Sequence, residues 1–507
     1  MLLEQVIAVS QALRATRSRL AKRDAVAQLL RASLPHEVPL VASYLAGVLP
    51  QRRIGVGWRG LRDAPEPGVD ASVTVTELDE ALSAVAAVSG AGAVGQRKAL
   101  LAQLFGRLTD AEQRFVTGLI QGELRQGAGD GVMLAAIAEA SGVPEQSVRR
   151  AVMLAGFAAP VAAAALHGGA DAVAEIGLVV GRPVRPMLAG SATDVDSALD
   201  GRIRQQVETK LDGIRVQAHK IDDEVRLFTR SLEEITDRLP EVVEIVQHLP
   251  ARRLVLDGEA VALTPDGRPQ PFQITGARTA SSADPQRLRQ ETPVTPMFFD
   301  LLHLHGVDLI DRPFRERHRQ LVELVPADWL VAHEAADGPD ATQRFFDERV
   351  AAGDEGVVVK DLDAPYAAGR RGAGWVKVKP RHTLDLVVLA VEWGSGRRQG
   401  FLSNIHLGAR DPETSEFVML GKTFKGMTDE MLRWQTERFA ELAIDRDDWV
   451  VQVRPEQVVE IAFDGLQRSS RYPGGLALRF ARVIRYRDDK RAEDADTIET
   501  VRALAGG

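Results

Sequence analysis

The hydrophobic period of the chain changes near Gly181, and this change argues against a single uniform core. Before Gly181, alanine- and leucine-rich runs such as residues 99–108 repeat at helical spacing. After Ala189, short strand-like runs take over. The nine residues 181–189 contain two prolines, which stop a helix. Because 507 residues also exceed what one core usually holds, we expect a domain boundary near this segment.

The region after this boundary is predicted to form an α+β domain followed by a small barrel. Strands are expected at residues 214–218, 224–229, 254–263, 295–304, 356–360 and 375–378, with a helix at 316–325. From residue 384 onward, strands are expected at 385–393, 403–409, 416–420 and 458–463, with a helix at 429–442. The chain is therefore predicted to be a multidomain protein with an all-α domain at 1–181, an α+β domain at 182–383 and a β-barrel domain at 384–507.

One helix start in the first domain is explicit. Thr109 and Glu112 have the spacing of a capping box, and an apolar stripe follows at Phe115, Val116, Leu119 and Ile120. We expect this stripe to lie in the core of the domain.

Three patterns resemble known sites but lack the required context. Residues 90–95 match G-x-G-x-x-G, yet a helical alanine run precedes them where a strand is needed, so we expect a turn between helices. Lys422 and Thr423 resemble the end of a P-loop, but Glu416 stands where its first glycine belongs. His303 and His305 lie two apart on a predicted strand without any accompanying metal spacing.

Composition excludes several classes of protein. The chain has no cysteine, which excludes disulfides, cysteine-ligated zinc, iron–sulfur clusters and thiol nucleophiles. Its net charge of −8 argues against a protein that only coats nucleic acid, although local basic grooves remain possible. The first 21 residues include three arginines and a glutamate, so they form neither a signal peptide nor a membrane span. We expect a cytoplasmic protein that does not bind membranes.

Lysine is scarce in this chain. Its 63 basic residues comprise 53 arginines and only ten lysines, and Lys360, Lys377 and Lys379 fall within twenty residues. Lysine differs from arginine because its amine can lose a proton and act as a nucleophile. A retained lysine therefore indicates either a required amine or, for this cluster, chance grouping on the surface.

Five short blocks follow one another in strand and turn contexts. The first is K-x-D-G-x-R at Lys210, Asp212, Gly213 and Arg215, where glycine permits a tight turn and arginine offers a fork for phosphate or ribose oxygens. A salt bridge between Lys210 and Asp212 is the simpler alternative for this block. The other four are L-D-G-E at 256–259, F-F-D at 298–300, D-E-G-V-V-V-K at 354–360 and W-V-K-V-K at 375–379. Their order makes coincidence improbable.

These blocks resemble motifs I, III, IIIa, IV and V of ATP-dependent DNA ligases, which belong to the covalent nucleotidyltransferase superfamily. Residues 230–234 resemble motif Ia, and residues 479–490 resemble the C-terminal motif VI. The resemblance implies an ATP-grasp-like adenylation core and an OB-fold barrel. It also implies three reactions in DNA replication, repair or recombination: AMP moves from ATP to a lysine, then to a DNA 5′-phosphate, and a 3′-hydroxyl displaces it to seal a nick.

The resemblance assigns roles to individual residues. It makes Lys210 the nucleophile that carries AMP, and it places Phe299 against the adenine ring, as aromatic faces stack on bases. Lys377 and Lys379, two apart on one predicted strand, share a face and would hold the α-phosphate. The remaining nucleotide contacts implied by the resemblance are Glu208 at the adenine edge and Arg215, Arg230, Glu259 and Arg371 at ribose or phosphate.

The resemblance also implies Mg²⁺, for which Glu259 and Glu355 are the candidate ligands. In motif VI, it implies that Arg485, Asp488 and Lys490 orient the pyrophosphate during lysine adenylylation.

The helical domain resembles the DNA-binding domain of larger ligases, most clearly at residues 122–127 and 185–189. Gln126 departs from that pattern, because an apolar residue is expected there, and Ser231 stands where motif Ia more often has asparagine. The resemblance implies a monomer that encircles nicked double-stranded DNA through contacts to phosphates and without reading bases.

Alternative readings share the lysine motif. For an RNA ligase or an mRNA capping enzyme, the helical domain and the 479–490 block argue in favour of DNA instead, and a capping enzyme needs neither of them. An NAD-dependent ligase is disfavoured, since that family resembles a cysteine-ligated zinc protein. A DNA-end-binding scaffold without catalysis is disfavoured by the intact Lys210, Glu355, Lys377 and Lys379.

Overall fold

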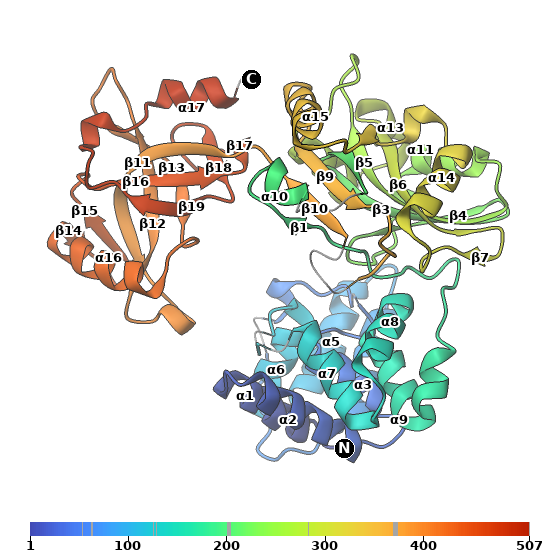
Figure 1. Ribbon diagram of the computed structural model, residues 1–507. Coiled ribbons are helices and arrows are strands. Elements are labelled where there is room, and N and C mark those ends of the chain that lie inside the picture. The colour runs from blue at the N-terminus through green and yellow to red at the C-terminus, as the bar shows by residue number, and fades with distance from the viewer. Residues whose placement is uncertain are drawn as a thin grey trace. The chain divides into compact units, whose positions relative to one another are not determined.

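The computed structural model describes residues 1–52, 54–61, 64–124, 126–127, 129–199, 204–281, 283–368 and 374–505. The chain separates into two compact units. Figure 1 colours the chain by residue number from the N-terminus to the C-terminus. The first unit contains residues 1–346, 352–354 and 358–377, and the second contains 347–351, 355–357 and 378–507. The predicted boundaries at 181 and 383 stay a prediction.

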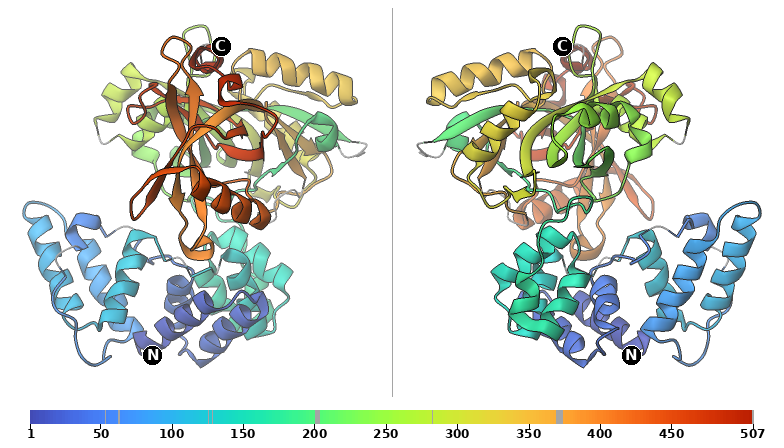
Figure 2. Two further views of the ribbon diagram at one scale, coloured as in Figure 1. Left: turned by 90° about the vertical axis from the view of Figure 1, so that its left-hand side faces the viewer. Right: turned by 90° about the vertical axis from the view of Figure 1, so that its right-hand side faces the viewer.

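The first part of the first unit is helical. Its helices are α1 (Leu3–Ala15), α2 (Arg19–Ala32), α3 (Val38–Leu45), α4 (Val75–Ala87), α5 (Ala93–Phe105), α6 (Asp110–Gln121), α7 (Asp130–Ser141), α8 (Glu145–Ala155) and α9 (Ala158–Ala174). Helix α2 packs against α7, α3 against α9, and α4 against α5. Figure 2 shows this helical part, in blue to teal, from two further sides. Leu3, Val26, Tyr44, Leu78 and Phe115 belong to one continuous core.

The predicted helix start at Thr109 is confirmed. The Glu112 backbone N–H donates to the Thr109 hydroxyl, and the Thr109 backbone N–H donates to the Glu112 carboxylate at 2.8 Å. Phe115, Val116 and Leu119 are buried as expected, whereas Ile120 is only half-buried. The glycine pattern at 90–95 spans the turn before α5 and the first residues of that helix, and Gly92 caps the helix with a φ of +81°.

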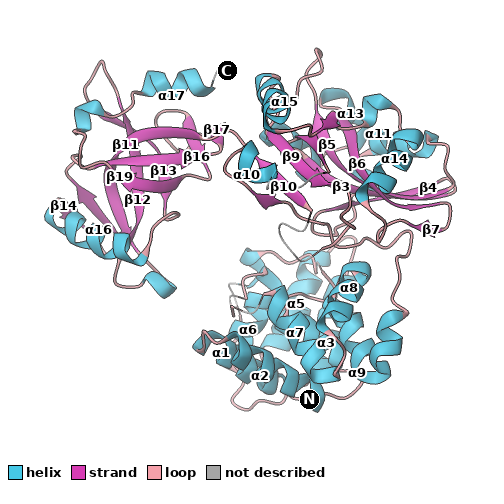
Figure 3. Ribbon diagram, in the orientation of Figure 1, coloured by secondary structure: helices cyan, strands magenta, loops and turns pink. Residues whose placement is uncertain are grey.

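The part of the first unit after residue 181 adds strands to helices, as Figure 3 shows. One sheet has the order β4 (Glu224–Thr229), β3 (Ile214–Ile221), β5 (Arg253–Ala262), β6 (Val294–Leu304) and β7 (Val307–Asp308). The other has the order β1 (Gly190–Ser191), β10 (Trp375–Val378), β9 (Gly356–Asp361), β2 (Gln205–Lys210) and β8 (His333–Ala335). The first five motif blocks lie on the strands of these two sheets or directly beside them, whereas the 479–490 block lies in the second unit.

The accompanying helices are α10 (Val195–Leu199), α11 (Pro240–His248), α12 (Phe272–Ala280), α13 (Pro285–Glu291), α14 (Phe314–Leu324) and α15 (Pro339–Ala351). Helix α11 packs against β4 and β6, and α14 packs against β6. Val216, Val242, Leu256 and Leu321 are fully buried in the core that these helices share with the antiparallel sheet. The sheet that carries Arg215 and Glu259 therefore rests on an apolar layer.

The second unit is rich in strands. They are β11 (His382–Trp393), β12 (Leu402–Arg410), β13 (Phe417–Thr423), β14 (Ala443–Arg446), β15 (Val450–Val453), β16 (Val458–Phe463), β17 (Gly465–Arg468), β18 (Leu476–Arg479) and β19 (Arg482–Tyr486), with helices α16 (Asp429–Glu441) and α17 (Ile498–Ala505). The first half of β11 pairs with β16, and its second half pairs with β15, while β12 lies on its other side. One long strand shared between several partners is typical of a small barrel.

Most predicted strands are confirmed to within a few residues. Two differences concern residues that matter for the site or for a predicted pattern. The polar strand β2 was not predicted, and β6 ends at Leu304, so the expectation that His303 and His305 share a strand is wrong. His305 lies in the following turn with a φ of +50°, whereas His303 is buried and contacts Asp308 at 2.7 Å.

Among the described residues, we find no helix that is both long and apolar enough to cross a membrane. The cytoplasmic location inferred from the sequence stays a prediction.

Candidate functional site

Lys210 is the last residue of β2 and is half-buried, with its ammonium 3.3 Å from the Leu211 carbonyl. The chain then turns sharply at Gly213. A Cβ atom on Gly213 would lie 2.4 Å from the Ala260 carbonyl oxygen, so only glycine permits this approach of β3 to β5. The close backbone approach expected at this glycine is thus confirmed, and it lies three residues after Lys210.

Glu259 on β5 faces this turn. Its Oε1 accepts the Gly213 backbone N–H at 3.2 Å, and the β3 register pairs it with Arg215. Burial raises the pKa of Glu259 to about 7, although the charges of Lys210 and Arg215 act in the opposite direction. The carboxylate therefore shares the electrostatic environment of the candidate nucleophile.

Arg215 is held by a bidentate ion pair. Its Nε and Nη2 donate to the two oxygens of Asp257 at 3.0 and 2.6 Å, and its Nη1 donates to the Met187 carbonyl at 2.7 Å. The Asp257 side chain is fully buried, and that of Arg215 is 14% exposed. Arg215 thus sits where the sequence places a phosphate or ribose contact, but protein groups already engage most of its donors.

Phe298 and Phe299 point to opposite faces of β6. Phe298 is fully buried in the sheet core, whereas Phe299 is half-buried and meets Trp375 edge to face with ring centroids 5.8 Å apart. The Arg215 guanidinium lies 5.3 Å from the Phe299 ring centroid. Phe299, rather than Phe298, is the aromatic side chain adjacent to the candidate nucleotide residues.

Glu208 precedes Lys210 on β2 and is buried. Its carboxylate pairs with Lys360 at 2.5 Å and accepts a hydrogen bond from Gln206 at 2.9 Å. Burial raises the pKa of Glu208 and lowers that of Lys360, and their mutual attraction opposes both shifts. The side chain that was expected at the adenine edge is therefore already engaged by a buried lysine.

Lys360 is itself enclosed by aromatic rings. Its ammonium lies 4.8, 4.5 and 4.5 Å from the ring centroids of Phe299, Phe314 and Trp375. Sequence reasoning placed Lys360 in a motif but gave it no role, because its partner Glu208 lies far away in the chain. The shortage of lysine was the signal that could have found it.

Lys377 is half-buried on β10. The strand ends at Val378, so the expectation that Lys377 and Lys379 lie on one strand is wrong. In the second unit, Lys379 pairs with Glu355 and, at 3.1 Å, with Asp464. Burial acts to lower the pKa of Lys379, but these two carboxylates outweigh burial and raise it.

The remaining predicted residues are dispersed. Arg230 is exposed just after β4, next to a loop in which Leu232 has a φ of +65°. Arg371 lies outside the described residues. In the second unit, Arg485 pairs with Glu460, Lys490 with Asp385, and Asp488 accepts a hydrogen bond from Gln457.

The helical block 122–127 shows how its unusual residue is accommodated. Gln126 is buried, and its amide donates to the Leu45 carbonyl at the end of α3. Lys22 donates to the Gly127 carbonyl at 2.7 Å. The polar residue therefore replaces an apolar contact with a hydrogen bond to a helix end.

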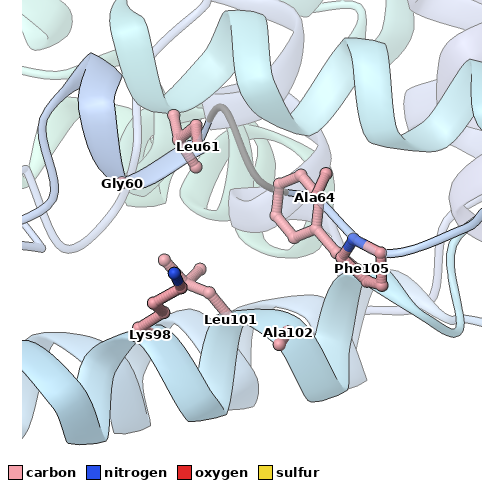
Figure 4. Close-up of a pocket in the computed structure, with 8 residues that line it drawn as sticks. Gly60, Leu61, Ala64, Lys98, Leu101, Ala102 and Phe105 are labelled. Atoms are coloured by element: carbon pink, nitrogen blue, oxygen red, sulfur yellow. The ribbon is translucent and has the colours of Figure 1, made fainter.

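A small hollow lies elsewhere in the helical part. Figure 4 shows Lys98, Leu101 and Phe105 of α5 on one side and Gly60 and Leu61 on the other. Its lining is largely apolar and includes none of the motif residues, so we assign no chemistry to it.

Comparison with known proteins agrees with this arrangement. Three family models match the chain: the DNA ligase N terminus over residues 61–138, the ATP dependent DNA ligase domain over 186–379 and the ATP dependent DNA ligase C terminal region over 398–490. A probable DNA ligase of Beutenbergia cavernae is 59% identical, with 100% of both chains covered. DNA ligase B of Mycobacterium tuberculosis is 55% identical, covering 99% of this chain and 100% of the relative.

One solved structure, Pmar-Lig_PreS3, shares the fold with a TM-score of 0.62 at 18% identity, covering 95% of this chain and 99% of that one. A helical N-terminal region, a nucleotidyltransferase core and a strand-rich C-terminal domain are thus present together. The chain belongs to the ATP-dependent DNA ligase family, and it is an enzyme of that family.

Proposed function

We propose that this ligase seals nicks in duplex DNA through AMP bound covalently to Lys210. The observation that carries the proposal is the position of Lys210 at the end of β2, in a turn that only glycine permits and opposite the Glu259 carboxylate. Phosphoryl transfer depends on positioning and on charge around the phosphate oxygens, and the end of β2 sets where the Lys210 side chain leaves the backbone.

In the first step, the deprotonated Lys210 amine attacks the α-phosphorus of ATP. A phosphorus–nitrogen bond forms, the bond to the bridging oxygen breaks, pyrophosphate leaves, and the nitrogen gives up a proton to solvent. Lys377 holds α-phosphate oxygens, and Phe299 stacks on the adenine ring. Arg215 and Glu259 contact ribose or phosphate.

In the second step, an oxygen of the DNA 5′-phosphate attacks the same phosphorus, and the lysine amine leaves and regains its proton. In the third step, the 3′-hydroxyl across the nick attacks the 5′-phosphate. The new phosphodiester bond forms, AMP leaves, and the hydroxyl proton passes to solvent. The duplex is held by a single copy of the chain through contacts to its phosphates.

Mg²⁺ is part of this proposal. No group of three or more His, Cys, Asp or Glu side chains among the described residues could hold a metal ion. Mg²⁺ needs only one or two carboxylates when substrate phosphates and waters supply further oxygens, so the carboxylates of Glu259 and Glu355 fit in kind. When bound, the ion would neutralise negative charge on the phosphates.

The test is self-labelling. The purified chain, stripped of bound AMP with pyrophosphate, is incubated with α-³²P-ATP and Mg²⁺ without DNA and run on a denaturing gel. We expect label on the native chain, none on Lys210→Ala, and full label on the control Lys98→Ala, which removes an exposed lysine of the helical part. Label retained by Lys210→Ala would contradict the proposal, and sealing of a nicked duplex by the native chain completes the test.

A further inference from the structure

A closed ring of hydrogen bonds surrounds the Arg215 guanidinium. Tyr366 donates to Asp257 Oδ2 at 2.6 Å and accepts the Met187 backbone N–H at 3.0 Å. Arg215 completes the ring through Asp257 and the Met187 carbonyl. The four residues come from segments far apart in the chain, yet they meet in the first unit.

The ring leaves Arg215 little freedom. Of its five N–H groups, the one on Nε, one on Nη1 and one on Nη2 are engaged by Asp257 and Met187, and a second on Nη2 lies 3.4 Å from the Tyr366 oxygen. In the described part of the chain, one N–H on Nη1 is left for a ligand. Its direction is fixed because the guanidinium is planar and its other donors are held.

Tyr366 touches both anchors of this guanidinium. Its hydroxyl binds the Asp257 oxygen that receives Nη2 and the backbone of the residue whose carbonyl receives Nη1. Tyr366 is 1% exposed, and its ring packs edge to face on Trp375 with centroids 5.8 Å apart. Burial and the Asp257 carboxylate raise the pKa of Tyr366, so its hydroxyl remains a donor throughout the neutral range.

We infer that Tyr366 is a positioning residue for ATP binding: its hydroxyl aims the remaining N–H of Arg215 at the nucleotide. Tyr366 does not touch the nucleotide in this account. The inference rests on the proposed function, because it takes Arg215 as a nucleotide contact. Tyr366 lies between motifs IV and V, and the motif blocks assigned no role to this residue.

The test uses Tyr366→Phe, which keeps the ring and removes the hydroxyl. Initial rates of self-labelling are measured over a range of ATP concentrations with the full chain. We expect the half-saturating ATP concentration to rise about five- to tenfold, the effect of loosening one charge-assisted hydrogen bond, and the maximal rate to stay within about twofold. Such a split between binding and rate is not expected from a general loss of structure.

Two further variants complete the design. Tyr44→Phe removes another fully buried tyrosine hydroxyl, in the helical part, and is expected to leave the half-saturating ATP concentration unchanged. In an Arg215→Lys background, Tyr366→Phe is expected to add less than about twofold, because the group that it positions is gone.

The outcomes separate the two claims. Labelling of the native chain with an unchanged half-saturating ATP concentration in Tyr366→Phe overturns the inference alone. The inference is also overturned if Tyr366→Phe raises the half-saturating ATP concentration by the same factor in the Arg215→Lys background as in the native chain. Absence of labelling in the native chain overturns the proposed function and the inference together.

Discussion

The two units of this ligase differ in how deeply their most buried ion pairs lie. In the first unit, Arg317 and Asp300 are both fully buried and joined by two hydrogen bonds of 2.8 and 2.9 Å, and Lys360 and Glu208 are almost as buried. In the second unit, pairs such as Arg485 with Glu460 and Arg454 with Glu456 face solvent. The buried pairs hold their side chains in one arrangement beside the nucleotide motifs, because a buried charge that loses its partner costs much free energy. The exposed pairs can break at little cost in free energy, because water solvates both charges.

Breaking a buried pair gives the largest expected effect on stability. Arg317→Met leaves the Asp300 carboxylate buried without its partner, and we expect a loss of about 3–5 kcal/mol in the unfolding free energy of the first unit. Arg252→Ala is the matched control, because it breaks an exposed pair with Asp222 in the same unit. Chemical denaturation of both variants makes the comparison, and a loss below about 1 kcal/mol for Arg317→Met would contradict the account.

Acid gives an intermediate effect through His219. This side chain is 1% exposed, and burial, with the nearby Arg226 and His303, lowers its pKa to about 3. Because the unfolded chain binds a proton below about pH 6.5 and the folded chain does not, stability is unaffected above that pH and falls as pH drops towards 3. At pH 5 the expected loss from this group is about 2 kcal/mol.

His219→Gln tests this prediction. The variant keeps an acceptor near the Gly181 backbone N–H but cannot take up a proton in the unfolded state. Stability measured at pH 7 and pH 5 is expected to fall less in the variant than in the native chain. Equal losses in both chains would show that His219 is not the source of the acid sensitivity.

An exposed pair of the second unit gives the smallest expected effect on stability. Arg485 is 63% exposed, so Arg485→Ala should change the unfolding free energy by less than about 1 kcal/mol. If motif VI orients pyrophosphate, the same change lowers the rate of self-labelling about 100-fold, as removal of a preorganised donor does. Arg454→Ala, which breaks the exposed pair with Glu456, should leave that rate unchanged, and equal rates in both variants would contradict the role of Arg485.

The strands that the sequence predicted are present, but several others were not predicted, among them the central strand β2. Strand β2 carries Lys210, yet its buried residues include Gln205, Gln206, Glu208 and Thr209, so it lacks the apolar alternation that predicts a strand. By contrast, the glycine after the lysine predicted a turn locally, although the close approach to Ala260 that requires glycine at position 213 could be seen only in the fold. The turn was recognisable, but the strand that leads into it was not.

Partners across the fold were also beyond local reasoning. The hydroxyl of Tyr366 and the carboxylate of Asp257 are 109 residues apart in the chain, and the Lys360 pair with Glu208 joins two strands of a sheet whose order the sequence does not state. Motif order identified the family, and side-chain roles such as those of Asp257 and Tyr366 required the tertiary contacts.

The central claim is that Lys210 carries AMP, and peptide mapping tests it most directly. The chain is labelled with ATP and Mg²⁺ and digested under conditions that preserve the phosphorus–nitrogen bond, and the adenylylated peptide is sequenced by mass spectrometry. The account predicts AMP on Lys210. Finding AMP on Lys360, Lys377 or any other residue would contradict it.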